Sequence, residues 1–319
     1  MTPEISFDQL PLKKEGPFGN AWGRFGATDQ LGTLNLLTPD VVADAAKEIK
    51  TGDRVSLDWR LNMPSAPMFG RQAFVHEIRN KAPRTVNDDV LHFNTQCSTQ
   101  WDGLRHYGYQ EAKVFYNGVT QKDIESSNLL GIDVVAENGG VVGRGVLLDY
   151  VAHAEKHGLP ITPFESRDIP ISVIKDIARE QAVSFRPGDI LFVRSGFVRA
   201  YEALSDAERA ALAERPSPDF AGVQAGHDTL RWLWENQFSA VAGDAIAFER
   251  APVSGPHAAQ DTLHQWLLAG WGCPIGEMFD LEKLAEKCRQ LGRWTFFVSS
   301  VPLKVPGGVA SPPNAVAIF

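Results

Sequence analysis

The hydrophobic positions of this chain gather in short apolar runs that are separated by amphipathic stretches. The runs 145–149, 238–242 and 294–298 are almost wholly apolar, as is typical of strands buried on both faces of a sheet. The β-rich runs 54–61 and 190–194 each follow a Gly-Asp pair that indicates a turn. These five runs predict the strands of one central sheet.

Helical patterns lie between the apolar runs. Thr38, Pro39 and Asp40 indicate a helix start, because they supply a capping hydroxyl, a proline at the first helical position and an acid near the positive end of the helix dipole. Ser205 and Glu208 have the spacing of a capping box. Helices are expected over residues 39–49, 173–182, 206–213, 225–235, 260–268 and 281–291, the last ended by Gly292. Alternating strands and helices predict an α/β fold.

Composition narrows the class of protein. The 319 residues are read as a single domain with long loops. The net charge of -8 argues against a nucleic-acid partner. Three cysteines without a paired spacing favour a reducing compartment, and neither a signal peptide nor a membrane-length apolar run is present. We therefore expect a cytoplasmic protein without a membrane partner.

Four residues that handle protons or metals gather within eleven positions, namely Gln96, Gln100, Asp102 and His106. The ligands of a single metal ion must converge, but a strand rises about 3.3 Å per residue, so the two glutamines would lie roughly 13 Å apart on a straight strand. If both glutamines bind one ion, the chain must therefore turn near residues 97–99. Taken alone, each glutamine is an ordinary loop residue and Asp102 followed by glycine is a common turn. Only the combination with a second segment indicates a site.

The second segment runs from His264 to Glu277. His264 shares a helical face with Leu267 and Leu268, so taken alone it is a core histidine with satisfied hydrogen bonds. Glu277 stands in an apolar stretch that includes Ile275. A carboxylate in such surroundings is costly to bury unless it is paired or binds a cation, and Glu277 is therefore the stronger sign of a site.

Both segments resemble signatures of the cyclase family, whose known members include bacterial kynurenine formamidase and isatin hydrolase. The first is similar to H-x-G-T-H-x-D-x-x-x-H, and the second to H-x-x-L-L followed by G-x-x-I-x-E. The likeness continues at residues 188–196, 241–244 and 301–312 and covers roughly residues 53–319. Residues 22–35 resemble the N-terminal extension of longer family members, so the resemblance implies that residues 1–52 form an extension packed on the same domain as a catalytic unit of residues 53–319. It implies a cyclase-like, swivelling β/β/α catalytic domain with a central mixed sheet or barrel-like core flanked by helices.

The resemblance also implies roles for single residues. It places the general base on His106 and the metal ligands on Gln96, Gln100, Asp102, His264 and Glu277. Both leading histidines of the family motif are glutamine here, which replaces an imidazole nitrogen by an amide oxygen and shifts the preference toward harder ions. Manganese or zinc is the expected divalent ion, and whether one ion or two are bound stays open.

We accordingly expect a metal-dependent hydrolase that uses a metal-activated water to open an amide, imide or lactone bond of a small, cyclic or aromatic carbonyl compound. Two alternatives stay open: a metal-dependent cyclase, dehydratase or isomerase of the same family, and a metal-free binding protein. Convergence of Asp102, His264 and Glu277 on one ion distinguishes the enzymes from the binding protein. The resemblance further implies a homodimer or homotetramer.

Other candidate residues are weaker. Cys97 lies in the first motif, but no neighbouring feature predicts a lowered thiol pKa. Ser195 lacks the G-x-S-x-G pattern of a nucleophile elbow. His153 and His157 share a helical face without a glutamate between them, and we interpret them as part of a surface helix.

Overall fold

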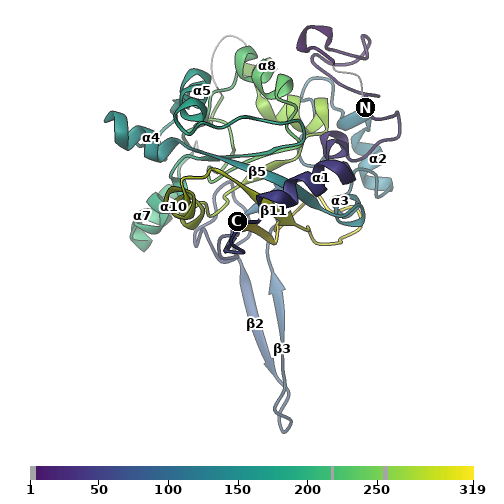
Figure 1. Cartoon of the computed structure of the whole chain (residues 1–319). Helices are drawn as coiled ribbons and strands as arrows, with labels where there is room; N and C mark the ends of the chain where they lie inside the picture. Colours follow the sequence, from purple (N-terminus) through teal and green to yellow (C-terminus); the bar gives the residue numbers. More distant parts are fainter. Residues whose placement is uncertain (1–4, 217–218, 254–257) are drawn as a thin grey trace.

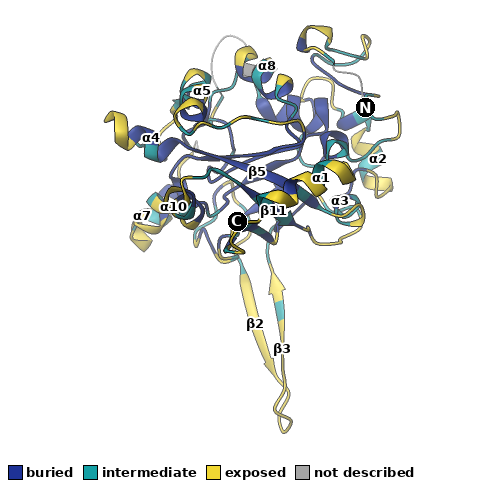
Figure 2. Cartoon of the chain, viewed as in Figure 1, coloured by how far each residue is buried: buried dark blue, intermediate teal, exposed yellow. Residues whose placement is uncertain are grey.

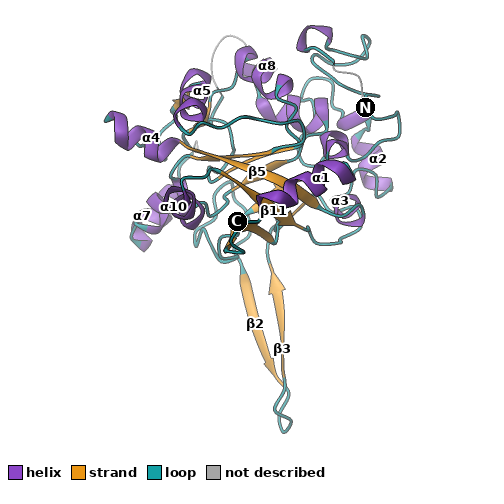
Figure 3. Cartoon of the chain, in the orientation of Figure 1, coloured by secondary structure: helices purple, strands orange, loops and turns teal. Residues whose placement is uncertain are grey.

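The computed structural model describes residues 5–216, 219–253 and 258–319, and its centre is a nine-stranded mixed sheet (Figures 1 and 3). The strands lie in the order β1-β13-β11-β5-β7-β9-β10-β4-β12. Helices flank this sheet, which confirms the predicted α/β domain with a central mixed sheet. Within the described residues, no helix combines the length and the apolar character needed to cross a bilayer.

The elements have the following bounds. The strands are β1 (Arg54–Ser56), β2 (Val75–Asn80), β3 (Asn87–His92), β4 (Gln100–Asp102), β5 (Val141–Asp149), β6 (Asp168–Ile169), β7 (Ile190–Arg194), β8 (Gly222–Val223), β9 (Ala240–Gly243), β10 (Ile275–Glu277), β11 (Thr295–Ser300), β12 (Ala310–Ser311) and β13 (Ala315–Ile318). The α-helices are α1 (Pro39–Ala45), α2 (Gln121–Ser126), α3 (Asp133–Glu137), α4 (Tyr150–His157), α5 (Ile171–Glu180), α6 (Phe197–Glu202), α7 (Asp206–Ala213), α8 (His227–Glu235), α9 (Ala258–Asp261) and α10 (Glu282–Leu291). A π-helix, η5, spans Gln265–Trp271, and 3-10 helices span Phe7–Gln9, Gly32–Leu36, Ala46–Glu48 and Tyr116–Gly118.

The central strands β5, β7, β9 and β10 run parallel, and Figure 2 shows β5 as buried. Alternate side chains of these strands enter two separate hydrophobic clusters. Leu148 and Leu191 join the cluster that includes residues of α5 and α8, whereas Leu147 and Phe192 join the cluster that includes residues of α10. Burial on both faces explains why these strands appear in the sequence as continuous apolar runs.

Four of the five predicted strands are confirmed, in β5, β7, β9 and β11. The fifth prediction, 54–61, is wrong beyond Ser56, because β1 ends there. The carboxylate of Asp58 accepts hydrogen bonds from the backbone N–H groups of Asn314 (2.9 Å) and Ala315 (2.7 Å). A side chain thus takes the donors at the start of β13 that a longer strand would need.

The predicted helix boundaries hold where capping residues marked them. Thr38 caps α1 by accepting from the N–H of Val41, Ser205 forms a capping box with Glu208 at the start of α7, and α10 ends at Gly292 with φ of 60°. The continuous helix expected over 260–268 is wrong, since α9 and the π-helix η5 replace it.

The described part of the N-terminal segment, residues 5–52, lies against the body of the protein. The indole N–H of Trp22 donates to the carbonyl of Ala269 (2.8 Å), and the hydroxyl of Thr33 donates to the carbonyl of Ser239 (2.7 Å). At Gly32, an added Cβ would lie 2.0 Å from the backbone oxygen of Gly272. This close approach of the two backbones requires glycine at position 32.

A long β-hairpin formed by β2 and β3 projects from the body and is nearly all exposed (Figures 1 and 2). The sequence patterns above did not predict it. Its strands mix polar and apolar residues on both faces, so they lack the strict alternation that marks a half-buried strand.

Candidate metal centre

Gln96, Gln100 and Asp102 of the first segment lie on a turn and on the short strand that follows it, and His106 lies in the turn after that strand. Residues 95–99 form turns and bends, as the spacing argument predicted, and β4 begins at Gln100. Strand β10 pairs antiparallel with β4 and sets Glu277 opposite Gln100. Because side chains two residues apart share a face of a sheet, Gln100, Asp102 and Glu277 face the same side.

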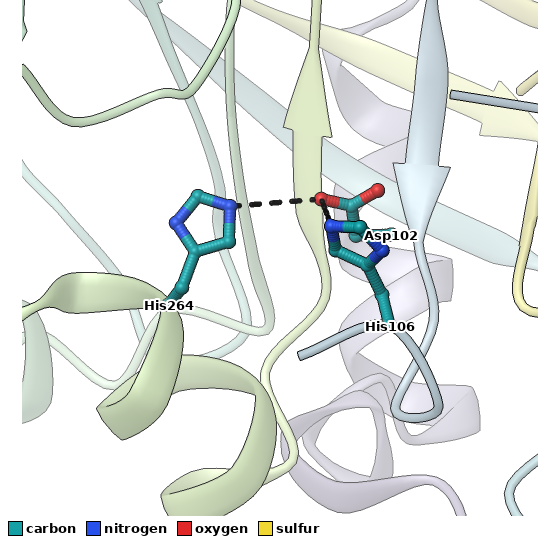
Figure 4. Close-up of side chains that lie close together, drawn as sticks. All are labelled: Asp102, His106 and His264. Atoms are coloured by element: carbon teal, nitrogen blue, oxygen red, sulfur yellow. Dashed lines mark ion pairs between the residues drawn. The ribbon is translucent and has the colours of Figure 1, made fainter. Parts of the chain in front are cut away.

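Two histidines approach Asp102 on this side (Figure 4). The Nε2 atoms of His106 and His264 each lie 3.8 Å from Oδ2 of Asp102. The three ligand atoms all lie within 4.8 Å of one another. The structure therefore brings residues from two distant segments of the chain to one point.

Glu249 holds His264 in place. Its carboxylate accepts from the backbone N–H groups of Leu263 (2.5 Å) and His264 (3.1 Å), and its Oε1 lies 2.7 Å from Nδ1 of the His264 ring. These contacts define the start of η5 and replace the continuous helix expected there. A carboxylate on one ring nitrogen fixes the tautomer and leaves Nε2 directed at Asp102 and Glu277, as is common for histidines that bind metals.

The two glutamines donate to the carboxylates. Nε2 of Gln96 donates to Oδ1 of Asp102, and Nε2 of Gln100 donates to Oε2 of Glu277 (2.7 Å) and to Oε1 of Gln96 (3.4 Å). In this arrangement their amide nitrogens, and not their oxygens, face the acids. A glutamine has to turn its terminal amide over before its oxygen can bind an ion near these carboxylates.

The charges at the centre are unbalanced. Asp102, Glu249 and Glu277 are buried acids grouped around one buried imidazole, that of His264. Burial lowers the pKa of His264, but hydrogen bonds to Glu249 and Glu277 outweigh that effect and hold its pKa well above the ordinary value. Burial raises the pKa of Glu277, and the nearby Asp102 raises it further. The His264 imidazolium and the nearby Arg71 guanidinium together carry two positive charges, one fewer than three ionised carboxylates require.

Two buried oxygens of the centre have no hydrogen-bond partner among the described residues, Oδ2 of Asp102 and Oε1 of Gln100. Buried acceptors of this kind require a donor or a cation. The first of them faces both histidine nitrogens, and the surrounding acids leave a deficit of positive charge. The oxygen and nitrogen donors therefore fit a divalent ion such as manganese or zinc.

His106 differs from His264 in its surroundings. Its side chain is one-fifth exposed. Burial lowers its pKa, and the attraction of Asp102 opposes this only in part. His106 is therefore neutral near pH 7 and able to accept a proton.

A cavity of about 280 Å³ opens beside the centre. His106, His264 and Glu277 form its polar end, and Phe69, Arg71, Tyr107 and Ile246 are among its other lining residues. Arg71 donates to the backbone oxygen of Gln96 (2.7 Å), which fixes a cation at the wall. This volume lies close to the lower end of the range for small-molecule pockets, about 300 Å³, which suits a small ligand.

Sequence reasoning missed three residues of this site. Glu249 follows the apolar residues 245–248. An acid in an apolar stretch is the signal that indicated Glu277, and the same signal could have identified Glu249. Arg71 and Tyr107 carry no local signal, because only the fold brings them to the cavity.

The weaker candidates have other surroundings. Burial raises the pKa of the Cys97 thiol, which disfavours the thiolate that a nucleophile needs. Ser195 donates its hydroxyl to Oδ1 of Asp244 (2.7 Å), and among the described residues its side chain contacts this acid rather than a histidine. His153 and His157 share helix α4 and both contact Glu180 of α5. His157 is exposed, as expected of a surface helix, but His153 is buried, so the expectation is wrong for that residue.

Comparisons with known proteins agree with this architecture. The family model Cyclase matches residues 55–250, more than half of the chain. No curated protein matches the chain significantly. Among solved structures, the chain is similar to one described as a novel cyclase, with 32% identity and a TM-score of 0.82 over 94% of this chain and 99% of that one.

Isatin hydrolases share the fold at lower identity. One, bound to the product analogue thioisatinate, is 14% identical with a TM-score of 0.60 over 86% of this chain and 94% of that one. Isatin hydrolase A from Labrenzia aggregata, bound to benzyl benzoate, is 18% identical with a TM-score of 0.59 over 89% of this chain and 98% of that one. The family match and the 32% identity over nearly the whole length show that this chain belongs to the cyclase family.

Proposed function

We propose that the chain is a metal-dependent hydrolase that opens an amide, imide or lactone bond in a small cyclic or aromatic carbonyl compound. The observation that carries the proposal is the unpartnered Oδ2 of Asp102, which two histidine nitrogens approach at the polar end of a small cavity. The substrate class is proposed by analogy with the isatin hydrolases, which share the fold.

Asp102, His264 and Glu277 would hold the ion, with Gln96 and Gln100 as the neutral members of the set. A bound divalent ion supplies Lewis acidity, which polarises a carbonyl and lowers the pKa of water. The hydrogen bond between Glu249 and His264 keeps the ring in one orientation. Manganese and zinc both suit such a mixed set of oxygen and nitrogen donors.

His106 is the proposed general base. It lines the cavity, lies beside Asp102 and has a lowered pKa, so it accepts a proton from water near pH 7 and returns it to the leaving nitrogen or oxygen. Arg71 offers its guanidinium to the carboxylate that ring opening produces, and the Phe69 and Tyr107 rings supply walls for a flat substrate.

A metal-free binding protein is the second candidate. The amide nitrogens of Gln96 and Gln100 already donate to Asp102 and Glu277, as they would in a site that manages its acids without an ion. In that case the cavity binds a small ligand without transforming it.

Metal analysis and two variants test the proposal. Protein purified without a His tag is expected to contain about one divalent ion per chain and to hydrolyse members of a panel of cyclic imides, lactones and N-acyl arylamines. Asp102→Asn is expected to lose both ion and activity, whereas His106→Ala keeps the ion and loses about 10² to 10⁴ in kcat.

Less than about a tenth of an equivalent after incubation with manganese or zinc would favour the binding protein. A His106→Ala enzyme with native kcat would remove the base assignment while leaving the ion in place.

A further inference from the structure

A second group of side chains that can bind a metal lies outside the candidate metal centre, where helices α4 and α5 pack together (Figure 1). It consists of His153 and His157 of α4 and Glu180 of α5, and we call it the helix-pair cluster. One ligand atom from each of its residues lies within 4.8 Å of the others, as in the group formed by Asp102 and its two histidines.

The two imidazoles of the helix-pair cluster approach one carboxylate. Nδ1 of His153 lies 3.3 Å from Oε2 of Glu180, and Nε2 of His157 lies 2.7 Å from Oε1. The centroids of the two rings are 4.4 Å apart, because residues four positions apart are neighbours on the surface of a helix. Two nitrogens and one oxygen therefore face the same point from two helices.

The cluster combines a fixed ligand with ligands open to solvent. The side chain of His153 is only 8% exposed, whereas His157 is 43% exposed and Glu180 is 29% exposed. All three residues line a cleft of about 630 Å³, which Asp176 and Arg179 also border. An ion can thus reach the cluster from solvent, and one of its ligands is already held in position.

Lys156 supplies a positive charge to this carboxylate. Its ammonium group lies 3.1 Å from Oε2 of Glu180, and its side chain is 62% exposed. Such an exposed ion pair contributes little stability, so a divalent ion can displace the lysine. Chiefly through the hydrogen bond with His157, the pKa of Glu180 falls to about 2. The carboxylate is therefore ionised near pH 7 and is available as a charged ligand.

We propose that the helix-pair cluster binds a zinc ion through Nδ1 of His153, Nε2 of His157 and one carboxylate oxygen of Glu180. Zinc binds imidazole and carboxylate at about 2.0–2.2 Å, so tetrahedral geometry sets the ligand atoms about 3.3–3.6 Å apart. Shifts of about 1 Å bring the three atoms to this spacing. Water fills the fourth position. Two imidazoles favour zinc over manganese, which prefers a set of oxygens.

The ion would tie α4 to α5. Helix α4 follows strand β5 directly, with Asp149 as its capping residue, and residues of α5 join a hydrophobic cluster of the core. Zinc would therefore stabilise the folded state. The proposal does not depend on the proposed function, because the cavity beside His106 is lined by other residues.

The helix-pair cluster and the candidate metal centre are expected to differ in affinity. Three ligands, two of them exposed and one engaged by a lysine, hold zinc less firmly than a closed set of four. We expect a dissociation constant of about 10 µM for the cluster. It would then release zinc during purification and stay empty at the lower concentrations that are expected to fill the centre.

Zinc titration of Asp102→Asn measures the cluster separately, because this variant is expected to leave the centre empty. Calorimetry at about pH 8, where ligands lose their protons more readily, is expected to show one zinc ion per chain with the affinity given above. Adding either His157→Ala or Glu180→Gln should weaken binding at least about tenfold. Adding His92→Ala, which removes an exposed histidine of β3, should leave binding unchanged.

Lys156→Ala distinguishes a metal site from a cluster of ordinary ion pairs. The substitution removes the ammonium group that competes for Glu180 and a positive charge beside the ion, so zinc is expected to bind about tenfold more tightly. Lys175→Ala is the matched control, since it removes an exposed lysine from α5 and should have little effect. A Lys156→Ala variant that binds zinc no more tightly would contradict binding at Glu180.

The native protein is titrated in parallel, so that the test stands even if Asp102→Asn does not fold, and circular dichroism checks each variant. Folded native protein without a weak zinc site up to about 1 mM would overturn the proposal. Undiminished binding in both His157→Ala and Glu180→Gln would do the same. Because calorimetry does not depend on activity, an inactive enzyme that still fills the cluster would count only against the proposed function.

Discussion

At the residue scale, His264 shows how one imidazole connects the parts of a site. Glu249 binds its Nδ1, and its Nε2 lies 3.1 Å from Glu277 and 3.8 Å from Asp102. Three acids from three different segments thus share one ring. The ring orientation depends on Glu249, whose carboxylate contacts Leu263 and His264.

The glutamines are the residues at which this chain departs from the family motif. Gln100→His is expected to raise the affinity for zinc more than for manganese, because an imidazole nitrogen suits zinc better than an amide oxygen does. Gln100→Ala is expected to weaken both, since it removes the amide oxygen that is proposed to bind the ion. Competitive titration in a chelator buffer measures the affinities, with Gln290→His on the exposed face of α10 as the control for adventitious zinc.

Unchanged affinities in both Gln100 variants would place this residue outside the set that holds the ion. Asp102, His264 and Glu277 would then be left as its protein ligands.

At the element scale, close backbone contacts and side-chain clamps decide how segments lie together. The N-terminal segment meets the end of η5 at Gly32 and Gly272, and helices α4 and α5 meet at Glu180. Each of these contacts yields a prediction with its own control.

Gly32→Ala is expected to lower the free energy of unfolding by about 2–5 kcal/mol, because the new Cβ adds a backbone clash to the strain of a positive φ. Gly158→Ala is the matched control. Gly158 also has a positive φ, of 65°, but no atom lies within 4 Å of its added Cβ, so about 1–2 kcal/mol is expected there. Urea unfolding measures both, and equal losses would mean that the Gly272 contact is unimportant.

The contribution of Glu180 to the free energy of unfolding is expected to depend on pH. The hydrogen bond from His157 lowers the pKa of Glu180 most strongly, and hydrogen bonds from Lys156 and His153 lower it further. Desolvation opposes them, and the pKa falls from 4.5 to about 2. A lowered pKa in the folded state means that the ionised group stabilises the fold above pH 4.5 and that this stabilisation is lost as the pH falls toward 2. The difference in unfolding free energy between the native protein and Glu180→Gln is expected to shrink over that range.

Denaturant unfolding at pH 7, 4 and 3 measures this difference. The exposed Glu77→Gln in β2 serves as a control for the loss of one surface charge. A difference between native protein and Glu180→Gln that stays constant with pH would contradict the assignment.

At the scale of the whole molecule, an ion at the centre would join strands β4 and β10 to η5. Anything that binds only the folded state stabilises it, by about 2.7 kcal/mol at a hundred times the dissociation constant. Adding manganese or zinc to chelator-treated protein is expected to raise the Tm. Asp102→Asn should show no such rise, and an equal rise in both proteins would mean that the ion binds elsewhere.

The sequence by itself determined the elements with strong local signals. Capping residues such as Thr38 and Ser205 defined helix starts, and the nearly apolar run of β5 and the β-rich run of β7 identified central strands. These signals succeed because backbone capping and two-sided burial act through neighbours in the chain. The family likeness supplied the candidate site residues Asp102, His264 and Glu277.

Only the tertiary structure decided how those residues meet. The pairing of β4 with β10 and the contact of Glu249 with His264 join segments far apart in the sequence. The split of the helix at 260–268 and the end of β1 at Ser56 follow from side-chain carboxylates that take backbone donors. The hairpin of β2 and β3 was not predicted, because both faces of its strands mix polar and apolar residues. Long-range contacts produce no periodic pattern in the sequence, because they form between residues that only the fold brings together.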